Sequence, residues 1–160
     1  IEANSIEMIK KPYYLADTID AAIAPFRAVA KKNDITLIVE SDNEIVLEHD
    51  CQWVAEAFGN IVKNAIEHTQ KNGFVKITSE ETPITVEVRI QDNGEGIRKK
   101  DLPQIFKRFY QVEGQKARSA GIGLELAKEI LEKNDADIYV NSVFDIGTEF
   151  IITFLKKPLD

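Results

Sequence analysis

The succession of elements along the chain predicts an α/β fold, a two-layer sandwich in which one mixed, mostly antiparallel sheet of about five strands is covered on one face by three helices. Two observations carry this prediction. Three segments repeat apolar residues at helical spacing, whereas the segments between them alternate apolar and polar residues or are rich in β-branched residues. The chain has 160 residues, of which 44% are hydrophobic, and this is enough for the core of one domain.

The N-terminal part is predicted to contain an extended segment, a helix and two strands. Pro12-Tyr13-Tyr14 is expected to be extended and able to pair at a sheet edge. The helix is expected to start at Asp17 as its N-cap and to bend at Pro25, because proline lacks the N–H that a helix needs. Residues 35–39 and 45–47 are rich in β-branched and aliphatic side chains, so both are predicted strands.

A second helix is predicted to follow Asp50, a good N-cap residue, and to carry an unbroken apolar stripe. The stripe consists of Trp53, Val54, Ala57, Phe58, Ile61, Val62, Ala65 and Ile66. On a neighbouring face Asn60 and Asn64 lie one turn apart, and Glu67 or His68 continues the row. Amide oxygens can share a magnesium ion with phosphate oxygens, but two surface asparagines would account for this helix equally well.

The second half of the chain is predicted to hold four strands and one helix. Residues 74–78 and 84–88 are expected to form a hairpin. Apolar residues at helical spacing predict a third helix over about 123–133. The last two strands, 137–142 and 148–155, are joined by a tight turn, and together these elements complete the predicted sheet.

The stretch from 89 to 123 holds the strongest indications of function. A strand delivers Asp92-Asn93-Gly94-Glu95-Gly96 at its end, and Gly121-Ile122-Gly123-Leu124 precedes the third helix. A carboxylate at a strand end can accept a hydrogen bond from a ligand, and glycines let the backbone approach that ligand closely. Glycines before a helix leave free N–H groups for phosphate. The stretch therefore predicts a nucleotide pocket.

Between the two glycine pairs lies a basic segment that is predicted to be a mobile lid. Its basic residues are Arg98, Lys99, Lys100, Lys107, Arg108, Lys116 and Arg118. On a protein that is acidic overall, such a local concentration suits an anionic ligand, although a solvated basic loop has the same composition.

Composition excludes several classes of function. A net charge of −7 and a pI near 5.0 argue against nucleic-acid binding, which normally needs a basic face. Cys51 is the only cysteine, so no intrachain disulfide can form, and no histidine and asparagine are placed to activate it as a nucleophile. No signal peptide or long apolar span is found. The chain starts at Ile1 without a methionine, as a piece of a longer polypeptide would.

Common nucleotide and metal motifs do not fit. Leu126 occupies the third glycine position of a dinucleotide fingerprint, and the preceding segment is polar rather than a strand. A phosphate loop ending in Gly-Lys-Ser/Thr and the eukaryotic protein-kinase motifs are absent from the sequence. His49 and His68 lie in different settings without zinc-ligand spacing, so each is expected to be a polar surface or pocket residue.

Five segments, in this order, resemble the conserved boxes of the catalytic and ATP-binding domain of bacterial sensor histidine kinases. That domain belongs to the superfamily that includes gyrase, Hsp90-type chaperones and mismatch-repair proteins. The segments are the N box at 60–65, the first glycine box at 92–97, the F box at 105–110, the second glycine box at 121–124 and the third at 147–150. The resemblance covers nearly the whole chain and favours a functional role for the two asparagines.

The resemblance implies an adenine pocket around the first and third glycine boxes. Asp92 would accept the hydrogen of the adenine amino group, and Thr148 would support it or a bridging water. Gly94 and Gly96 would let the backbone approach the base, and Ile97 ends this part of the pocket.

It also implies a phosphate and metal site. Asn64, helped by Asn60, would hold Mg²⁺ and phosphate, and His68 would lie against the nucleotide. The backbone at Gly121, Gly123 and Leu124 would bind phosphates at the helix N-terminus. Arg108, with Lys116 or Arg118 as alternatives from the lid, would neutralise charge on the γ-phosphate in the catalytic step.

The same comparison favours phosphate transfer over hydrolysis. Hydrolytic relatives carry a glutamate base at the position of Asn60, and a carboxamide cannot deprotonate water. Glu56, one turn earlier, leaves slow hydrolysis open. Three departures from the usual pattern, at Glu67, Gln111 and Glu125, put the γ-phosphate contacts in doubt. They leave open a nucleotide-binding regulatory module with weak or no phosphotransfer, and a serine kinase or anti-sigma factor as a third alternative.

The phospho-accepting histidine of such kinases is carried by a separate dimerisation domain, and neither histidine of this chain has its setting. Residues 1–14 are therefore expected to be a linker and the end of that domain, and residues 15–160 the ATP-binding domain, with a lid at about 98–120. The resemblance further implies a downstream response regulator, a homodimeric full-length protein and a monomeric fragment. It implies a cytoplasmic domain of a membrane-anchored protein.

Overall fold

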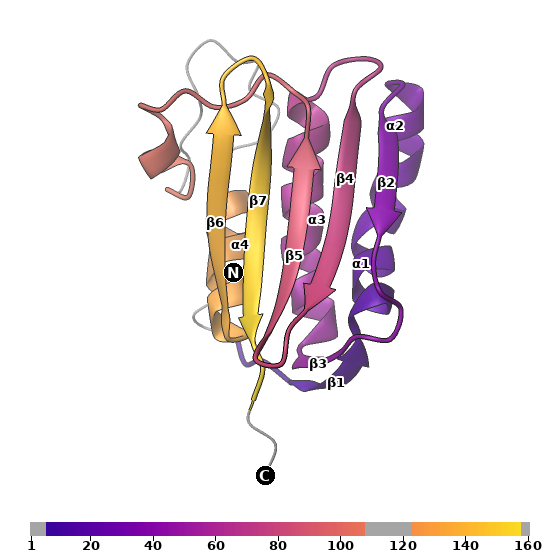
Figure 1. Cartoon of the computed structure of the whole chain (residues 1–160), viewed down its shortest axis with the longest axis vertical. Helices are drawn as coiled ribbons and strands as arrows, with labels where there is room; N and C mark the ends of the chain where they lie inside the picture. Colours follow the sequence, from indigo (N-terminus) through magenta and orange to yellow (C-terminus); the bar gives the residue numbers. More distant parts are fainter. Residues whose placement is uncertain (1–5, 108–122, 158–160) are drawn as a thin grey trace.

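The computed structural model describes residues 6–107 and 123–157. The main sheet has the strand order β2-β4-β5-β7-β6, and the helices cover one of its faces (Figure 1). Its strands are β2 (Thr36–Glu40), β4 (Phe74–Glu81), β5 (Thr85–Asp92), β7 (Gly147–Leu155) and β6 (Ala136–Val143). Only β2 and β4 pair in parallel, and the other three pairs are antiparallel. The predicted mixed, mostly antiparallel sheet of five strands is confirmed.

The first predicted helix is divided in two by its proline. Helix α1 (Leu15–Ile23) ends at a 3₁₀ turn, Ala24–Phe26, that contains Pro25, and α2 (Arg27–Lys32) continues beyond it. The bend was correctly predicted, but Asp17 is not the N-cap. The cap position is Tyr14, which still belongs to strand β1, and Asp17 lies in the first turn of α1. A carboxylate there is favourable because it faces the positive end of the helix dipole.

A small second sheet lies beside the helices. Strand β1 (Lys11–Tyr14) pairs antiparallel with β3 (Val46–His49), separate from the main sheet. The expected extended segment therefore pairs as a strand, although its partner is the short strand at 46–49 rather than an edge of the main sheet. The Leu15 N–H donates to the Ile45 carbonyl at 3.0 Å, so the chain passes directly from this sheet into α1.

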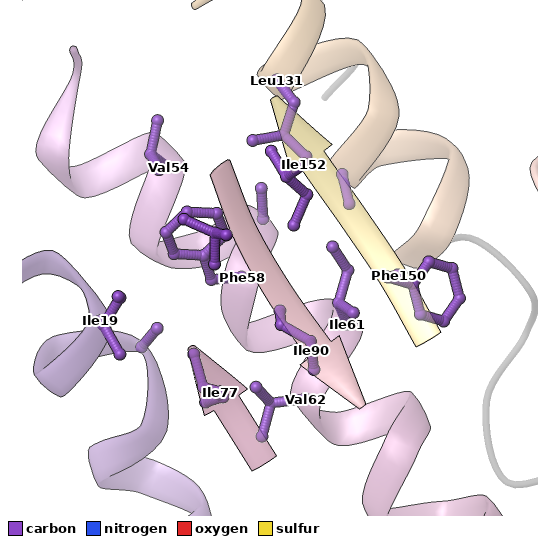
Figure 2. Close-up of a cluster of buried hydrophobic side chains, with 14 of the residues drawn as sticks. Ile19, Val54, Phe58, Ile61, Val62, Ile77, Ile90, Leu131, Phe150 and Ile152 are labelled. Carbon is purple, nitrogen blue, oxygen red and sulfur yellow. The ribbon is translucent and has the colours of Figure 1, made fainter. Parts of the chain in front are cut away.

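Helix α3 (Cys51–His68) packs its apolar stripe against the centre of the sheet (Figure 2). Apart from the partly buried Trp53, every residue of the predicted stripe is buried. Phe58 meets Phe154 of β7 edge to face, with ring centroids 6.2 Å apart. Helix α4 (Gly123–Lys133) covers the neighbouring part of the sheet through Ala127, Ile130 and Leu131. Packing in the core thus fixes the position of α3, and with it the position of the polar face that carries Asn60 and Asn64.

Asp50 holds both the start of α3 and the N-terminal segment. Its Oδ1 accepts the Trp53 N–H at 3.0 Å, as predicted for an N-cap, and its Oδ2 accepts the Ile9 N–H at 2.8 Å. The Asp50 N–H donates to Asn134 Oδ1 at 2.8 Å, just beyond the end of α4. Three separate parts of the chain therefore meet at this residue.

In the described residues, no helix combines the length and the apolar character that crossing a membrane would need.

Candidate nucleotide-binding site

Asp92 is the last residue of β5 and is almost completely buried, with 4% of its surface exposed. Its Oδ1 accepts the Gly94 N–H at 2.8 Å, and Thr148 is its partner in the register of β5 and β7. Burial raises the pKa of Asp92 from 3.8 to about 6, while hydrogen bonds from the backbone of Gly94 and Thr148 act in the opposite direction. The structure therefore places a carboxylate with spare hydrogen-bonding capacity in a largely desolvated position.

The first glycine box is held between α3 and the β6–β7 hairpin. Gly94 lies directly on the carbonyl oxygen of His68, and a side chain at this position would collide with it. Gly96 has a positive φ of 71°, a conformation that favours glycine. On the other side, the Asp145 N–H donates to the Glu95 carbonyl at 2.7 Å. The absence of side chains at Gly94 and Gly96 thus lets the loop pack closely against the end of α3 and the β6–β7 hairpin, whereas the predicted close approach to a ligand stays a prediction.

Two polar residues outside the predicted set fix the position of this loop. Asn93 Oδ1 accepts the Phe74 N–H at 2.7 Å and joins the loop to the start of β4. Ser142 Oγ accepts the Ile97 N–H at 2.7 Å, donates to the Gly147 carbonyl at 3.0 Å and lies 2.9 Å from Thr148 Oγ1. Ser142 therefore connects the first and third glycine boxes.

The sequence carries one signal for Ser142. Along β6, the inward-facing positions alternate with exposed ones, and Ala136 and Ile138 are buried there. Ser142 continues this inward series with a hydroxyl group. A polar residue at an inward position usually has a specific hydrogen-bonding partner.

Asn60 connects the N box to the second glycine box. Its Nδ2 donates to the Gly123 carbonyl at 3.3 Å, at the start of α4. Because the amide nitrogen is engaged in this way, Oδ1 remains available as an acceptor or metal ligand. Asn64 is half-buried one turn further along α3, and its side chain makes no hydrogen bond to a described residue. Glu56, one turn before Asn60, is exposed.

The donor set around these asparagines is compatible with magnesium. Across residues 6–107 and 123–157, no group of three or more His, Cys, Asp or Glu side chains is placed to hold a metal ion. A metal at this edge of α3 would instead be held by amide oxygens together with oxygens of a bound phosphate and water, which is a set that Mg²⁺ accepts.

His68 closes the end of α3 beside the first glycine box. Its Nδ1 lies 2.9 Å from Glu95 Oε1, and its carbonyl oxygen accepts the Glu95 N–H at 3.2 Å. The charges of both residues act on Asp92, since His68 lowers and Glu95 raises its pKa. The structure thus places close to Asp92 both His68, a predicted site residue, and Glu95, which was not in the predicted set.

The described part of the F box is anchored to the core. Ile105 is buried, and Phe106 meets Phe150 of β7 edge to face at 6.3 Å between ring centroids. The Nζ of Lys128 from α4 lies 5.3 Å from the centre of the Phe106 ring. Gly123 and Leu124 lie in the first turn of α4. The other predicted residues of this region, Arg108, Gln111, Lys116, Arg118 and Gly121, lie outside the described residues.

Three of the predicted site residues lie at one end of the molecule. Asp92 ends β5, His68 ends α3, and Thr148 lies near the start of β7. In Figure 1 these ends lie at the upper edge of the sheet, next to the β6–β7 hairpin. The site thus combines a buried carboxylate, closely packed glycines and the asparagine side chains of α3, which face the N-terminus of α4. These features define a nucleotide-binding domain.

A family model described as "Histidine kinase-, DNA gyrase B-, and HSP90-like ATPase" matches residues 49–158. The chain belongs to this ATPase family, whose domain binds ATP.

Several relatives of the chain are sensor kinases or sensor proteins. It is 35% identical over 127 residues to the heme sensor protein HssS of Staphylococcus saprophyticus, covering 79% of this chain and 27% of that protein. It is 30% identical over 121 residues to the sensor histidine kinase YvrG of Bacillus subtilis, covering 74% and 21%. The sensor protein kinase WalK of Staphylococcus aureus is 28% identical over 165 residues, covering 94% and 40%. The chain thus spans well under half the length of these relatives.

Solved structures show the same architecture. The catalytic domain of histidine kinase ThkA superposes with a TM-score of 0.82 at 27% identity, covering 94% of this chain and 100% of that one. ThkA in complex with the response regulator protein TrrA gives a TM-score of 0.78 at 27% identity, covering 94% and 43%. The fold of this chain is that of a histidine kinase ATPase catalytic domain.

Proposed function

We propose that this domain transfers the γ-phosphate of ATP to a histidine on a separate dimerisation domain, as a protein histidine kinase does. The observation that carries the proposal is the convergence of a buried Asp92 with the asparagine edge of α3 and the N-terminus of α4. The hydrogen bond from Asn60 to the Gly123 carbonyl, 3.3 Å long, joins the last two.

The base would be read by Asp92. The exocyclic amino group of adenine is a hydrogen-bond donor, and an ionised carboxylate is an acceptor only, so the two are complementary. Thr148 would support Asp92 or a bridging water from the neighbouring strand. Gly94, Gly96 and Ile97 would form the wall of the adenine pocket, because the two glycines add no side-chain bulk beside Asp92 and the partly buried Ile97 adds an apolar side chain.

The phosphates would lie between α3 and α4. Asn64 and the free Oδ1 of Asn60 are placed to hold Mg²⁺, which when bound neutralises charge on the phosphate oxygens. The N–H groups at Gly123 and Leu124, with Gly121 before them, would bind phosphate oxygens at the positive end of α4. Arg108 would act on the γ-phosphate from the lid.

The reaction type follows from what surrounds the phosphates. Asn60 cannot act as a base, and Glu56 is exposed, which favours transfer to another group over hydrolysis. Neither histidine of the chain suits the role of acceptor. His49 is fully buried and both of its ring nitrogens lie within hydrogen-bonding distance, of Thr18 Oγ1 at 2.7 Å and of the Leu47 carbonyl at 2.8 Å. His68 is engaged by Glu95.

One observation favours the second candidate, a nucleotide-binding regulatory module with weak or no phosphotransfer. Glu67 is a half-buried carboxylate on α3, whereas the resemblance to sensor histidine kinases implies a basic residue at this position. A negative charge there opposes the charge that develops on a transferring phosphate. The domain would then hold ATP or ADP without efficient chemistry.

The partners follow from the kinase proposal. The acceptor domain would be joined to this one through residues 1–14, of which Lys11–Tyr14 form β1. A response regulator would receive the phosphate, in keeping with the complex that ThkA forms with TrrA. The full-length protein would be a membrane-anchored homodimer with this domain in the cytoplasm, whereas the domain alone would be a monomer.

The test has two stages. ATP affinity is first measured for the chain and for Asp92→Asn by fluorescence titration; a strong loss in the variant supports the pocket, and an unchanged affinity refutes it. The chain is then mixed with its own dimerisation domain, Mg²⁺ and ATP labelled in the γ-phosphate. Acid-labile label on a histidine supports the kinase, tight binding without label supports the regulatory module, and acid-stable label points to a serine kinase.

A further inference from the structure

Glu95 makes two contacts with the last residue of α3, one through its backbone and one through its side chain. Its N–H donates to the His68 carbonyl at 3.2 Å, and its Oε1 lies 2.9 Å from His68 Nδ1. Both side chains are half-buried, with 27% of His68 and 37% of Glu95 exposed. The pair is therefore shielded enough to have a defined geometry and open enough to face a ligand.

The chemistry of the pair determines which ring nitrogen carries a proton. An ionised carboxylate can only accept a hydrogen bond, so His68 Nδ1 must be the donor. In the neutral ring this leaves Nε2 with a lone pair. Within the described residues Nε2 makes no hydrogen bond, and it is the ring nitrogen that remains available to a ligand.

The position of the pair links it to the nucleotide rather than to the core. The charges of both side chains influence Asp92, the residue that would read the base. Gly94, between Asp92 and Glu95, lies against the carbonyl of His68. The end of α3, with His68, therefore lies beside Asp92 and the proposed adenine pocket.

We propose that Glu95 is a positioning residue for ATP, which orients the imidazole of His68 and fixes its proton on Nδ1, so that Nε2 acts as an acceptor toward the nucleotide. This rests on the proposed ATP site. Glu95 lies between two glycines of the first glycine box, and its carboxylate contacts the imidazole at the end of α3.

The chain contains a matched control. Glu81 forms an ion pair with Lys156 at 2.9 Å, and its side chain is also 37% exposed, with 29% for its partner. This pair lies beside the β4–β5 hairpin, whereas Asp92 is at the opposite end of β5. Glu81→Ala therefore removes a comparable pair without touching the site.

The experiment measures Mg²⁺-ATP affinity for the protein and for Glu95→Ala, Glu95→Gln, His68→Ala and the double variant His68→Ala/Glu95→Ala. Glu95→Ala is expected to weaken binding about fivefold to tenfold, as the loss of one neutral hydrogen bond, that of His68 Nε2 to the nucleotide, does. Glu95→Gln retains an acceptor oxygen and is expected to bind within about twofold of the original protein. His68→Ala is expected to lose as much as Glu95→Ala, and the double variant no more than either.

A spectroscopic measurement separates positioning from a general effect on folding. In nitrogen-15 NMR spectra of the imidazole, the original protein should show the Nδ1–H form of His68, and Glu95→Ala should shift the proton toward Nε2. Glu81→Ala should change neither the spectrum nor the affinity. Unchanged ATP affinity in Glu95→Ala, an unchanged imidazole spectrum, or an additive loss in the double variant would each overturn the proposal.

Failure of this proposal is distinguishable from failure of the ATP site itself. If the original protein binds ATP and Asp92→Asn does not, the site stands and only the role of Glu95 is in question. If the original protein does not bind ATP, the proposed function is itself wrong.

Discussion

At the scale of single residues, the site depends on a carboxylate that the fold keeps largely away from water. Asp92 is 4% exposed, and burial raises its pKa to about 6 from 3.8. A raised pKa means that the folded state prefers the protonated form. Ionisation of Asp92 therefore costs folding stability, and an adenine amino group can offset this cost by donating to the charged oxygen.

The first prediction concerns the stability of the protein without nucleotide. The stabilising preference for protonated Asp92 is fully present below about pH 4 and is lost as the pH rises through about 6, a change of about 3 kcal/mol. Asp92→Asn lacks this titration and retains an oxygen to accept the Gly94 N–H. In urea unfolding it should be more stable than the original protein at pH 7, and the difference should vanish at acid pH. A variant that is less stable at pH 7 would contradict this account.

The second prediction concerns the pH dependence of ATP binding. Protonated Asp92 can no longer act purely as an acceptor, so ATP affinity should fall by about tenfold per pH unit below about 6. Isothermal titration over pH 5 to 8 measures this, with the range chosen to bracket the pKa of about 6. The control is the titration of the phosphates of ATP, measured without protein over the same pH range. An affinity profile that follows only this titration would exclude Asp92 as the group that titrates.

At the scale of elements, predictions from sequence succeeded where one pattern dominates and failed where a local signal competes with tertiary pairing. The stripe on α3 has a single solution, since its apolar residues must face the sheet. Asp17 looked like a helix start, but α1 begins earlier because β1 delivers the chain at Leu15, held by the Ile45 carbonyl. That bond joins residues distant in the sequence, and no local pattern contains it.

The candidate site likewise contains residues that could be predicted from the sequence and residues that could not. Asp92 and the glycines were identifiable because a strand end followed by glycines has few other uses. Ser142 was missed because its role depends on two tertiary arrangements. The β6–β7 hairpin brings Thr148 to it, and the packing of the first glycine box against this hairpin brings Ile97 to it. The bond between Asn60 and Gly123 likewise depends on how two helices pack. Contacts of this kind become visible only when the elements are assembled.

The third prediction concerns Ser142, whose hydrogen bonds connect β6 to the first glycine box. Ser142→Ala leaves the Ile97 N–H without its acceptor and should reduce stability by about 1–3 kcal/mol. ATP affinity should fall as well, because Thr148 and the first glycine box both lose the hydrogen-bonding partner that fixes their positions. Thermal unfolding and ATP titration measure the two effects.

Ser79 provides the control for this prediction. It is a serine of β4 whose Oγ lies 2.8 Å from Ser41 Oγ, away from the site. Ser79→Ala should alter ATP affinity little. An equal loss of affinity in both variants would show that Ser142 acts only through general stability.

At the scale of the whole molecule, the site is assembled from elements that are far apart in the sequence. A ligand that touches β5, α3 and α4 together must bind the folded chain and not the unfolded one. The fourth prediction is therefore that Mg²⁺-ATP at a hundredfold excess over Kd stabilises the domain by about 2.7 kcal/mol. For a chain of this size the melting temperature should rise by about 5–10 °C.

Differential scanning fluorimetry measures this shift. Asp92→Asn should show little shift at the same ATP concentration. A rise of equal size in Asp92→Asn would place the stabilising contacts outside the adenine pocket.

The two helices that flank the proposed phosphate site are joined at both ends. Asn60 donates to Gly123 near the site, and at the far end Asp50 donates to Asn134 while its carboxylate holds the Ile9 N–H. Helix α3, about 27 Å long, thus connects the N-terminal segment to the face that carries Asn60 and Asn64. Thermodynamic linkage then makes the influence mutual: any restraint on the N-terminal segment that changes ATP affinity by some factor must be altered by ATP through the same factor. Hydrogen exchange at the Ile9 amide, with and without nucleotide, would read this coupling free energy directly.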